Sequence, residues 1–198
     1  MRQERGQDMK KRYDALTIPN LLCYFRMILI PVFVIVYFSA QNVKGFYWAA
    51  AIIALSGITD LLDGKIARKF NQITELGKFL DPLADKLTQG AMVFCLASRF
   101  SWMWLLVAIF IIKEGFMGIM GLISLRKGKK LDGAMWFGKV CTALLYFVFF
   151  LLLLFPEIPL QIANILIGIC AVDMIATLIL YIPVFFKMLR SSSIDTNY

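Results

Sequence analysis

Long apolar blocks alternate with short charged or turn-forming segments along this chain. A helix needs about 20 mostly apolar residues to cross a bilayer. The blocks predict six transmembrane helices, over residues 21–39, 46–69, 79–98, 102–124, 137–155 and 160–186. Turn-forming residues separate some of them, such as Gln41-Asn42 after the first block and Pro156–Pro159 after the fifth. The pattern therefore predicts an all-α integral membrane protein with six transmembrane helices.

The segments outside the blocks are short, which favours one domain with two flanking pieces. We expect an N-terminal juxtamembrane segment at 1–17, a six-helix transmembrane domain at 18–190 and a C-terminal tail at 191–198. Residues 1–17 mix charges of both signs, as in a helix lying on the membrane surface or in a disordered charged tail. The first block lacks an A-x-A-like cleavage site, so we interpret it as a retained helix and not as a signal peptide.

Lysine and arginine are distributed unevenly between the connections, which predicts the orientation. One side would carry Arg2, Arg5, Lys10, Lys11, Arg12, Lys65, Arg68, Lys69, Lys78, Arg126, Lys127, Lys129, Lys130, Lys187 and Arg190. The other side would carry only Lys44 and Arg99, close to Trp48, Trp102 and Trp104. The positive-inside rule then places both termini in the cytoplasm, in a cell membrane of the inner, cytoplasmic type.

The composition excludes several kinds of chemistry. The chain is 60% hydrophobic, has a formal net charge of +8 and contains no histidine. Histidine-ligated zinc, phosphohistidine and Ser/His or Cys/His nucleophiles are therefore ruled out. The basic residues flank the apolar blocks, which favours membrane lipids and anionic substrates as partners and no nucleic acid. The four cysteines (Cys23, Cys95, Cys141 and Cys170) lie in apolar blocks without CxxC spacing, and we expect small core residues, not disulfides or metal ligands.

Four aspartates lie where ionised groups are costly. The second block contains Asp60 and Asp63, and the third contains Asp81 and Asp85. At helical spacing, two stripes form: Asp60, Asp63, Gly64, Ala67 and Arg68 on one helix, and Gly77, Asp81 and Asp85 on the next. The connection at 71–74 is short, so these helices are expected to be antiparallel neighbours with both stripes at the cytoplasmic end.

Carboxylates gathered in this way would repel one another unless cations neutralise them. Oxygen ligands select hard ions such as Mg²⁺ or Mn²⁺, and Mg²⁺ commonly binds carboxylates together with substrate phosphates. The small residues would let a pyrophosphate approach the backbone, and Arg68 can hold a phosphate by a fork of donors. Alternatively, the aspartates are ordinary helix-end residues and Gly57, Gly64 and Gly77 are packing glycines. Four aspartates at helical spacing on adjacent helices argue against that interpretation.

The two stripes resemble the signature of the CDP-alcohol phosphotransferase family, D-x2-D-G-x2-A-R-x8-G-x3-D-x3-D, at all eight positions from Asp60 to Asp85. The resemblance implies a six-helix fold of that family, CDP-alcohol phosphotransferase-like, and often a homodimer. It implies two metal ions, Mg²⁺ or Mn²⁺, on Asp60, Asp63, Asp81 and Asp85, with Asp85 as catalytic base on the acceptor hydroxyl. A CDP pocket would be formed by Asp60, Gly64, Ala67, Arg68 and Gly77.

The resemblance further implies transfer of a phosphatidyl group from CDP-diacylglycerol to an alcohol with release of CMP. Residues 79–86 are similar to two groups of the family, the phosphatidylglycerophosphate synthases and the cardiolipin synthases of this fold, and so are Ile18-Pro19-Asn20 and Arg26. Two positions depart from these groups: Cys23 replaces a common threonine, and Lys113-Glu114 replaces a common Arg-Glu pair.

Glycerol 3-phosphate is the acceptor that we expect, because its phosphate requires cations and several basic residues lie near the start of the fifth apolar block. Lys139 is the first candidate to bind it and Arg126 the second, whereas Lys127, Lys129 and Lys130 are more typical of a solvated loop. Phosphatidylglycerol, giving cardiolipin, is the alternative acceptor. Two other classes stay open: a divalent-cation transporter that uses the intramembrane carboxylates, and a non-catalytic membrane scaffold. For Asp173, in the last block, we expect a structural hydrogen bond.

Overall fold

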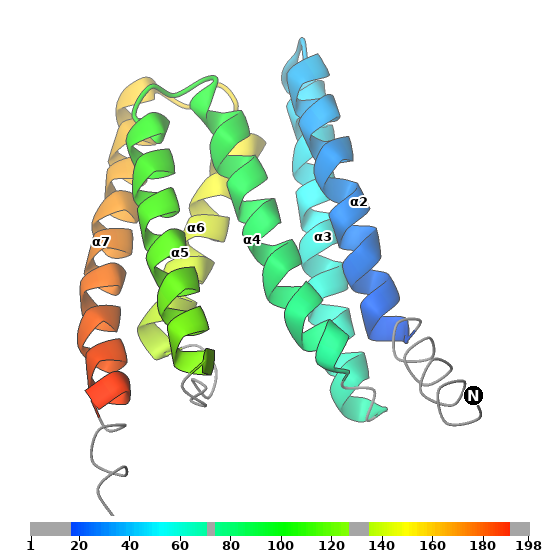
Figure 1. Ribbon diagram of the computed structural model, residues 1–198. Coiled ribbons are helices and arrows are strands. Elements are labelled where there is room, and N and C mark those ends of the chain that lie inside the picture. Colours follow the sequence, from blue (N-terminus) through cyan, green and yellow to red (C-terminus); the bar gives the residue numbers. More distant parts are fainter. Residues whose placement is uncertain (1–16, 71–73, 127–134, 191–198) are drawn as a thin grey trace, which may run out of the picture. The chain divides into compact units, whose positions relative to one another are not determined.

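The computed structural model describes residues 17–70, 74–126 and 135–190, without the side chains of Arg68, Glu75 and Arg190. Within these ranges the ordered elements are helices: α2 (Ile18–Ser39), α3 (Val43–Lys69), α4 (Glu75–Ala97), α5 (Met103–Arg126), α6 (Trp136–Leu154) and α7 (Leu160–Arg190) (Figure 1). Each corresponds to one apolar block of the sequence, with ends that differ by a few residues. The all-α prediction is confirmed.

Five of these helices are long and apolar enough to cross a membrane: α2, α3, α5, α6 and α7. In the described part of the chain, α4 is the exception, although its block was also expected to span. Asp81, Asp85 and Lys86 lie in its first half and lower its apolar character. The helix that contributes half of the aspartate cluster is thus the one whose sequence departs furthest from a simple membrane span.

The chain forms two compact units. The first comprises Met1–Cys95 with Leu153–Glu157, and the second comprises Leu96–Leu152 with Ile158–Tyr198. The first unit therefore contains α2, α3 and nearly all of α4, and the second contains α5, α7 and most of α6. All four aspartates of the signature belong to the first unit.

In the first unit, α2 and α3 pack against each other, joined by a tight turn. The Asn42 side chain caps α3 by accepting a hydrogen bond from the Gly45 backbone N–H at 3.0 Å. A Cβ on Gly45 would lie 2.7 Å from that of Ala40, so this turn requires a glycine. Phe33 and Ile53 are among the buried residues of the two helices. The sequence's turn signal at Gln41-Asn42 is confirmed.

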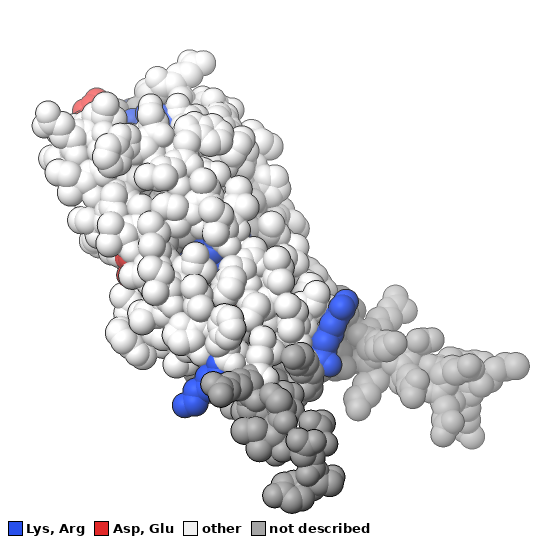
Figure 2. All heavy atoms as spheres, turned by 60° about the vertical axis from the view of Figure 1, so that its left-hand side comes forward, with Lys and Arg blue, Asp and Glu red and all other residues white. Residues whose placement is uncertain are grey.

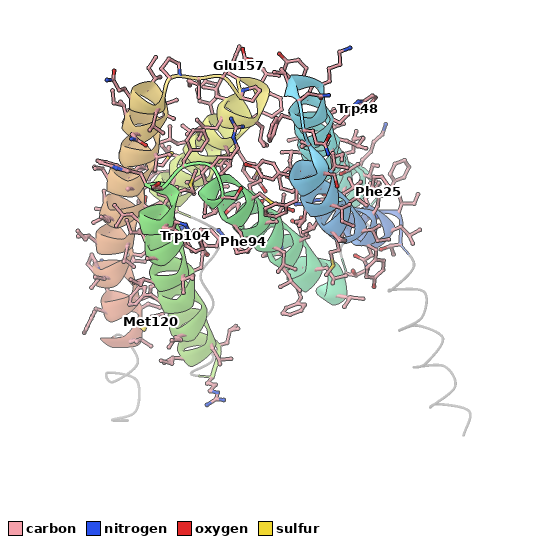
Figure 3. All side chains as sticks on the ribbon, turned by 90° about the horizontal axis from the view of Figure 1, so that it is seen from above. Phe25, Trp48, Phe94, Trp104, Met120 and Glu157 are labelled. Carbon is pink, nitrogen blue, oxygen red and sulfur yellow. The ribbon has the colours of Figure 1, made fainter. Side chains whose placement is uncertain are left out.

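In the second unit, α5 packs against α7, and aromatic residues fill the space beside them. Phe137 of α6 lies edge-on to Tyr181 of α7, with ring centroids 4.7 Å apart. Phe185 is a further buried member of this cluster, and the partly buried Met120 (Figure 3) is among the residues that pack against it. The cluster connects α5, α6 and α7 through contacts between aromatic and methionine side chains.

The outer surface carries the apolar side chains that a lipid environment requires. Figure 2 shows one face on which uncharged residues predominate. Exposed residues include Phe25 and Trp48 in the first unit and Trp104 in the second (Figure 3). An exposed apolar surface of this kind would be a liability in water and is expected for helices in contact with lipid.

Candidate active site

The four aspartates of the signature come together between α3 and α4. Asp60 and Asp63 lie near the end of α3, and Asp81 and Asp85 lie in the first half of α4. The side chain of Asp63 is only 5% exposed, whereas those of Asp60 and Asp81 are 42% and 52% exposed. The electrostatic interactions of Asp60 reach the other three carboxylates. The site therefore has a buried carboxylate at its base and exposed carboxylates at its opening.

A buried arginine from α2 connects these carboxylates. Arg26 is 1% exposed, and its Nη1 atom forms ion pairs with Asp60 at 2.5 Å and Asp81 at 2.9 Å. The same nitrogen lies 3.5 Å from Asp63. Three carboxylates from two helices thus converge on one nitrogen of a third helix. A guanidinium inside an apolar helix is costly, and these carboxylates offset that cost.

Asp85 differs from the other three in its contacts. It is half-buried and accepts a hydrogen bond from the Gln89 Nε2 atom at 3.3 Å, one turn further along α4. The Gln89 carbonyl in turn accepts a bond from Lys86 Nζ at 3.4 Å. This local network orients the Asp85 carboxylate from within α4.

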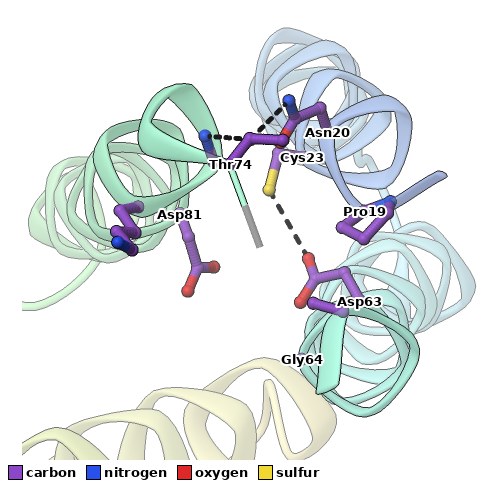
Figure 4. Close-up of a pocket in the computed structure, with 10 residues that line it drawn as sticks. Pro19, Asn20, Cys23, Asp63, Gly64, Thr74 and Asp81 are labelled. Carbon is purple, nitrogen blue, oxygen red and sulfur yellow. Dashed lines mark hydrogen bonds between the residues drawn. The ribbon is translucent and has the colours of Figure 1, made fainter. Parts of the chain in front are cut away.

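A cavity of about 150 Å³ lies beside the aspartates (Figure 4). Its lining includes three of the small residues that the sequence singled out, Gly64, Ala67 and Gly77. Asp63 and Asp81 contribute their side chains to the same cavity. All of its lining residues belong to the first unit, so this unit alone forms the cavity.

The start of α4 is fixed to α2 by hydrogen bonds at the edge of this cavity. The Thr74 hydroxyl caps the helix by accepting from the Gly77 backbone N–H at 2.9 Å, and the Asn20 amide nitrogen lies 3.0 Å from the same hydroxyl (Figure 4). A Cβ on Gly77 would lie 2.6 Å from Asn20 Oδ1. Gly77 thus permits close packing of α2 and α4, in addition to leaving space at the cavity.

Cys23 of α2 also reaches the carboxylates. Its thiol donates a hydrogen bond to Asp63 Oδ2 at 3.6 Å. The sulfur and one oxygen each of Asp63 and Asp81 lie within 4.8 Å of one another, close enough to hold a metal ion together. The prediction that Cys23 is only a small core residue was therefore incomplete, although all four cysteines are buried and none of them forms a disulfide within the described residues.

The donor set fits a divalent cation. The positive Nη1 atom of Arg26 already occupies the point where three carboxylates meet, which identifies that point as one that attracts positive charge. Carboxylate oxygens are ligands for hard ions such as Mg²⁺ and Mn²⁺. Asp60, Asp63 and Asp81 would hold such an ion, and Asp85 is near enough to interact with them electrostatically.

The other predicted residues are placed as follows. The backbone of Arg68 lies on α3 one turn beyond Gly64, and its side chain lies outside the described residues. Arg126 ends α5 and Lys139 lies in the first turn of α6, both exposed and both in the second unit. Lys127, Lys129 and Lys130 lie outside the described residues.

The second unit contains a separate group of buried polar residues. Lys113 is 4% exposed and forms an ion pair with its neighbour Glu114 at 2.7 Å. Cys141 hydrogen-bonds to Asp173 and Thr177. The structure thus supplies a partner for Asp173, in line with the structural hydrogen bond that we expected.

Sequence reasoning gave Arg26, Asn20 and Thr74 no place in the site. Arg26 carried a usable signal, because an arginine inside an apolar block demands a charged partner. Thr74 carried a weaker one, since threonine three residues before Gly77 is typical of a helix N-cap. Cys23 and Asn20 carried no such signal, and only the packing of α2 on α3 and α4 reveals their contacts.

The family model of the CDP-alcohol phosphatidyltransferases matches residues 16–189. The chain belongs to the CDP-alcohol phosphatidyltransferase family. The matched range includes residues of all six helices, in both units, and contains Asp60, Asp63, Asp81 and Asp85.

Two relatives refine this placement. The chain is 36% identical over 144 residues to "Cardiolipin synthase (CMP-forming)" of Streptomyces coelicolor, covering 71% of this chain and 66% of that protein. It is 40% identical over 129 residues to "CDP-diacylglycerol--glycerol-3-phosphate 3-phosphatidyltransferase" of Escherichia coli strain K12, covering 63% of this chain and 70% of that protein. The two groups of the family that the sequence resembled are thus both represented among the relatives of this phosphatidyltransferase.

Proposed function

We propose that this phosphatidyltransferase transfers a phosphatidyl group from CDP-diacylglycerol to glycerol 3-phosphate, with release of CMP. The observation that carries the proposal is the convergence of Asp60, Asp63 and Asp81 on one positively charged point beside a cavity lined by small residues. Such a site suits a diphosphate, whose oxygens bind the same cations as the carboxylates. The family membership and the names of both relatives support the same reaction class.

Two divalent ions, Mg²⁺ or Mn²⁺, are proposed as cofactors, with Asp60, Asp63, Asp81 and Asp85 as ligands. When bound, these ions supply positive charge to the pyrophosphate oxygens as charge develops on the leaving CMP. Gly64, Ala67 and Gly77 leave room for the cytidine diphosphate, and Asp60 and Arg68 complete the proposed CDP site.

Asp85 is the proposed catalytic base. Its carboxylate takes the proton from the acceptor hydroxyl. The hydroxyl oxygen then forms a bond to the β-phosphorus, while the bond from that phosphorus to the CMP oxygen breaks. Gln89 donates to Asp85 and keeps one of its oxygens oriented. Because the transfer is a single displacement, this mechanism requires no covalent intermediate on the chain.

The acceptor distinguishes two closely related activities. The relative from Escherichia coli is named for glycerol 3-phosphate, whose phosphate we assign to Lys139 and Arg126. The relative from Streptomyces coelicolor is named a cardiolipin synthase, so phosphatidylglycerol is the second candidate acceptor. Phosphatidylglycerol places less demand on a cationic site, because its phosphate is a diester with one negative charge.

The lysine and arginine distribution supports an orientation with both termini and the site at the cytoplasmic surface of an inner membrane. There the site can receive one membrane-embedded substrate and one acceptor from the water phase. We also propose a homodimer, on the basis of the family resemblance. In this arrangement 18–190 act as one catalytic domain, with 1–17 at the membrane surface and 191–198 as a tail.

Release of CMP from CDP-diacylglycerol tests this proposal. The purified protein in detergent is given Mg²⁺ or Mn²⁺ and, in separate reactions, glycerol 3-phosphate or phosphatidylglycerol. We expect CMP only with glycerol 3-phosphate, no activity in EDTA, and recovery when the metal is restored. Asp85→Asn should reduce the rate by about a hundredfold to ten-thousandfold, the range expected for loss of a general base.

The alternatives predict different results. Release with phosphatidylglycerol alone would make the protein a cardiolipin synthase and would remove the reason to assign Lys139 and Arg126 to the acceptor. No release with either acceptor would contradict the proposal. Metal flux into proteoliposomes in that case would favour a transporter, and its absence a scaffold.

A further inference from the structure

Arg26 occupies a position where its charge opposes the binding of a metal ion. Its Nη1 atom lies within 3.5 Å of carboxylate oxygens from Asp60, Asp63 and Asp81. These oxygens are the ones that we assign to the metal. A divalent ion and a guanidinium cannot both occupy the space between the same oxygens, and they repel each other at this distance.

The bonding of Arg26 is also incomplete. An arginine that is built permanently into an ion pair commonly uses two nitrogens against one carboxylate. Here Nη1 alone meets three carboxylates, while Nε is buried without a hydrogen-bond partner among the described residues. A buried unpaired donor is a cost that a rearrangement of the guanidinium can relieve.

Arg26 cannot relieve this conflict by losing its charge, because a guanidinium stays protonated in proteins. When a metal ion binds, the side chain must therefore move or the ion must bind against its repulsion. Without a metal ion, the same charge neutralises part of the carboxylate cluster and allows α2, α3 and α4 to pack.

We propose that Arg26 is a built-in counter-ion that substitutes for the metal in the metal-free protein and competes with it for Asp60, Asp63 and Asp81. The proposal rests on the metal site of the proposed function. It gives Arg26 two opposite effects: it stabilises the metal-free fold and it weakens metal binding. A purely structural ion pair would have only the first effect, and a residue that helps to hold the metal would strengthen binding.

Mn²⁺ titration of the detergent-purified protein tests this competition, with free Mn²⁺ followed by electron paramagnetic resonance. Arg26→Gln keeps hydrogen-bonding capacity and removes the charge, so its Kd for Mn²⁺ should be lower by about tenfold or more. Its Tm in EDTA should be below that of the wild type, and its gain in Tm with Mn²⁺ should be larger. Arg26→Lys keeps the charge and should retain a Kd near that of the wild type.

A matched control removes the other buried ion pair. The double variant Lys113→Gln/Glu114→Gln in the second unit should leave the Kd for Mn²⁺ unchanged. An Arg26→Gln protein that binds Mn²⁺ as weakly as the wild type, or more weakly, would overturn the competition. If the wild type binds no Mn²⁺ and Asp81→Asn changes nothing, the metal site of the proposed function is wrong instead.

A second measurement covers the case in which Arg26→Gln does not fold. Experimental structures of the wild type with Mn²⁺ and in EDTA should differ at this side chain. We expect Nη1 between the three carboxylates in EDTA and displaced from at least one of them with Mn²⁺ bound. A guanidinium that keeps all three contacts in both structures would refute the proposal.

Discussion

Among the residues that the structure describes, each unit buries one cation, Arg26 in the first and Lys113 in the second, and the two are neutralised in different ways. In the first unit, Arg26 of α2 meets three carboxylates that come from α3 and α4. In the second unit, Lys113 meets the carboxylate of its own neighbour on α5, Glu114. One cation facing one carboxylate forms a neutral ion pair. Three carboxylates around one cation leave a net negative charge, which a further cation can neutralise. We infer that an excess of carboxylates around a buried cation, more than the buried cation itself, marks the reactive site.

The largest expected difference between the units is in activity. Asp81→Asn should reduce CMP release by about a hundredfold or more, because a metal ligand supports several kcal/mol of charge stabilisation. Glu114→Gln should leave the rate within a few-fold of the wild type. Both rates are measured at saturating Mg²⁺, with Tm as a check on folding. A loss of activity in Glu114→Gln at an unchanged Tm would break the comparison, since the pair would then serve the reaction.

The next largest expected effect is on stability, when one partner of the Lys113–Glu114 ion pair is removed. Lys113→Met removes the ion pair of Glu114 with the Lys113 side chain and should lower the free energy of unfolding by about 3 kcal/mol. The double variant Lys113→Met/Glu114→Gln should recover most of that loss. Denaturation in detergent, followed by circular dichroism, measures both. A double variant as unstable as the single one would show that the instability comes from lost packing of the Lys113 side chain and not from an unpaired charge on Glu114.

Glycines provide a smaller test of how tightly each unit is packed. Gly77→Ala would place a Cβ against Asn20, and Gly138→Ala would place one against Tyr181. Each should cost about 1–3 kcal/mol of stability. Gly57→Ala is the control, because its Cβ would meet nothing within 4 Å. Only Gly77→Ala should also raise the KM for CDP-diacylglycerol, and equal KM values in both tight variants would contradict its place at the CDP cavity.

The smallest effect is expected at Cys23, which contacts Asp63 and lies near Asp81. Cys23→Ser keeps a hydrogen-bond donor and should change the rate with Mg²⁺ by less than about threefold. Cd²⁺ is softer than Mg²⁺ and prefers sulfur, so the variant should need about tenfold more Cd²⁺ for half-inhibition of CMP release. Identical Cd²⁺ sensitivity in the two proteins would show that the sulfur takes no part in metal binding.

Much of the fold follows from local pattern. Length and apolar content defined all six helices, and Asn42 and Gly45 make the turn between the first two as their residue types suggest. The α4 helix was expected to span like the others. Asp81, Asp85 and Lys86 make α4 less apolar than the five helices that could cross a membrane, and these charges were already visible in the sequence.

Less of the site could be predicted. Helical spacing and a short connection were enough to bring Asp60, Asp63 and Asp81 together, because neighbours in sequence remain neighbours in space there. The same reasoning could not supply Arg26, which is separated from Asp81 by 55 positions in the chain. For Lys139 and Arg126, a role at the acceptor stays a prediction, since both belong to the other unit.

By itself, the sequence determined the helices, the family and the pairing of aspartates on two stripes, because spacing along a helix translates directly into position on its surface. Only the tertiary structure decided which cation faces those aspartates, which small residues line the cavity and why Gly77 has no room for a side chain. These features depend on contacts between helices that are distant in sequence. Such contacts are set by how α2 packs on α3 and α4, and no local pattern records them.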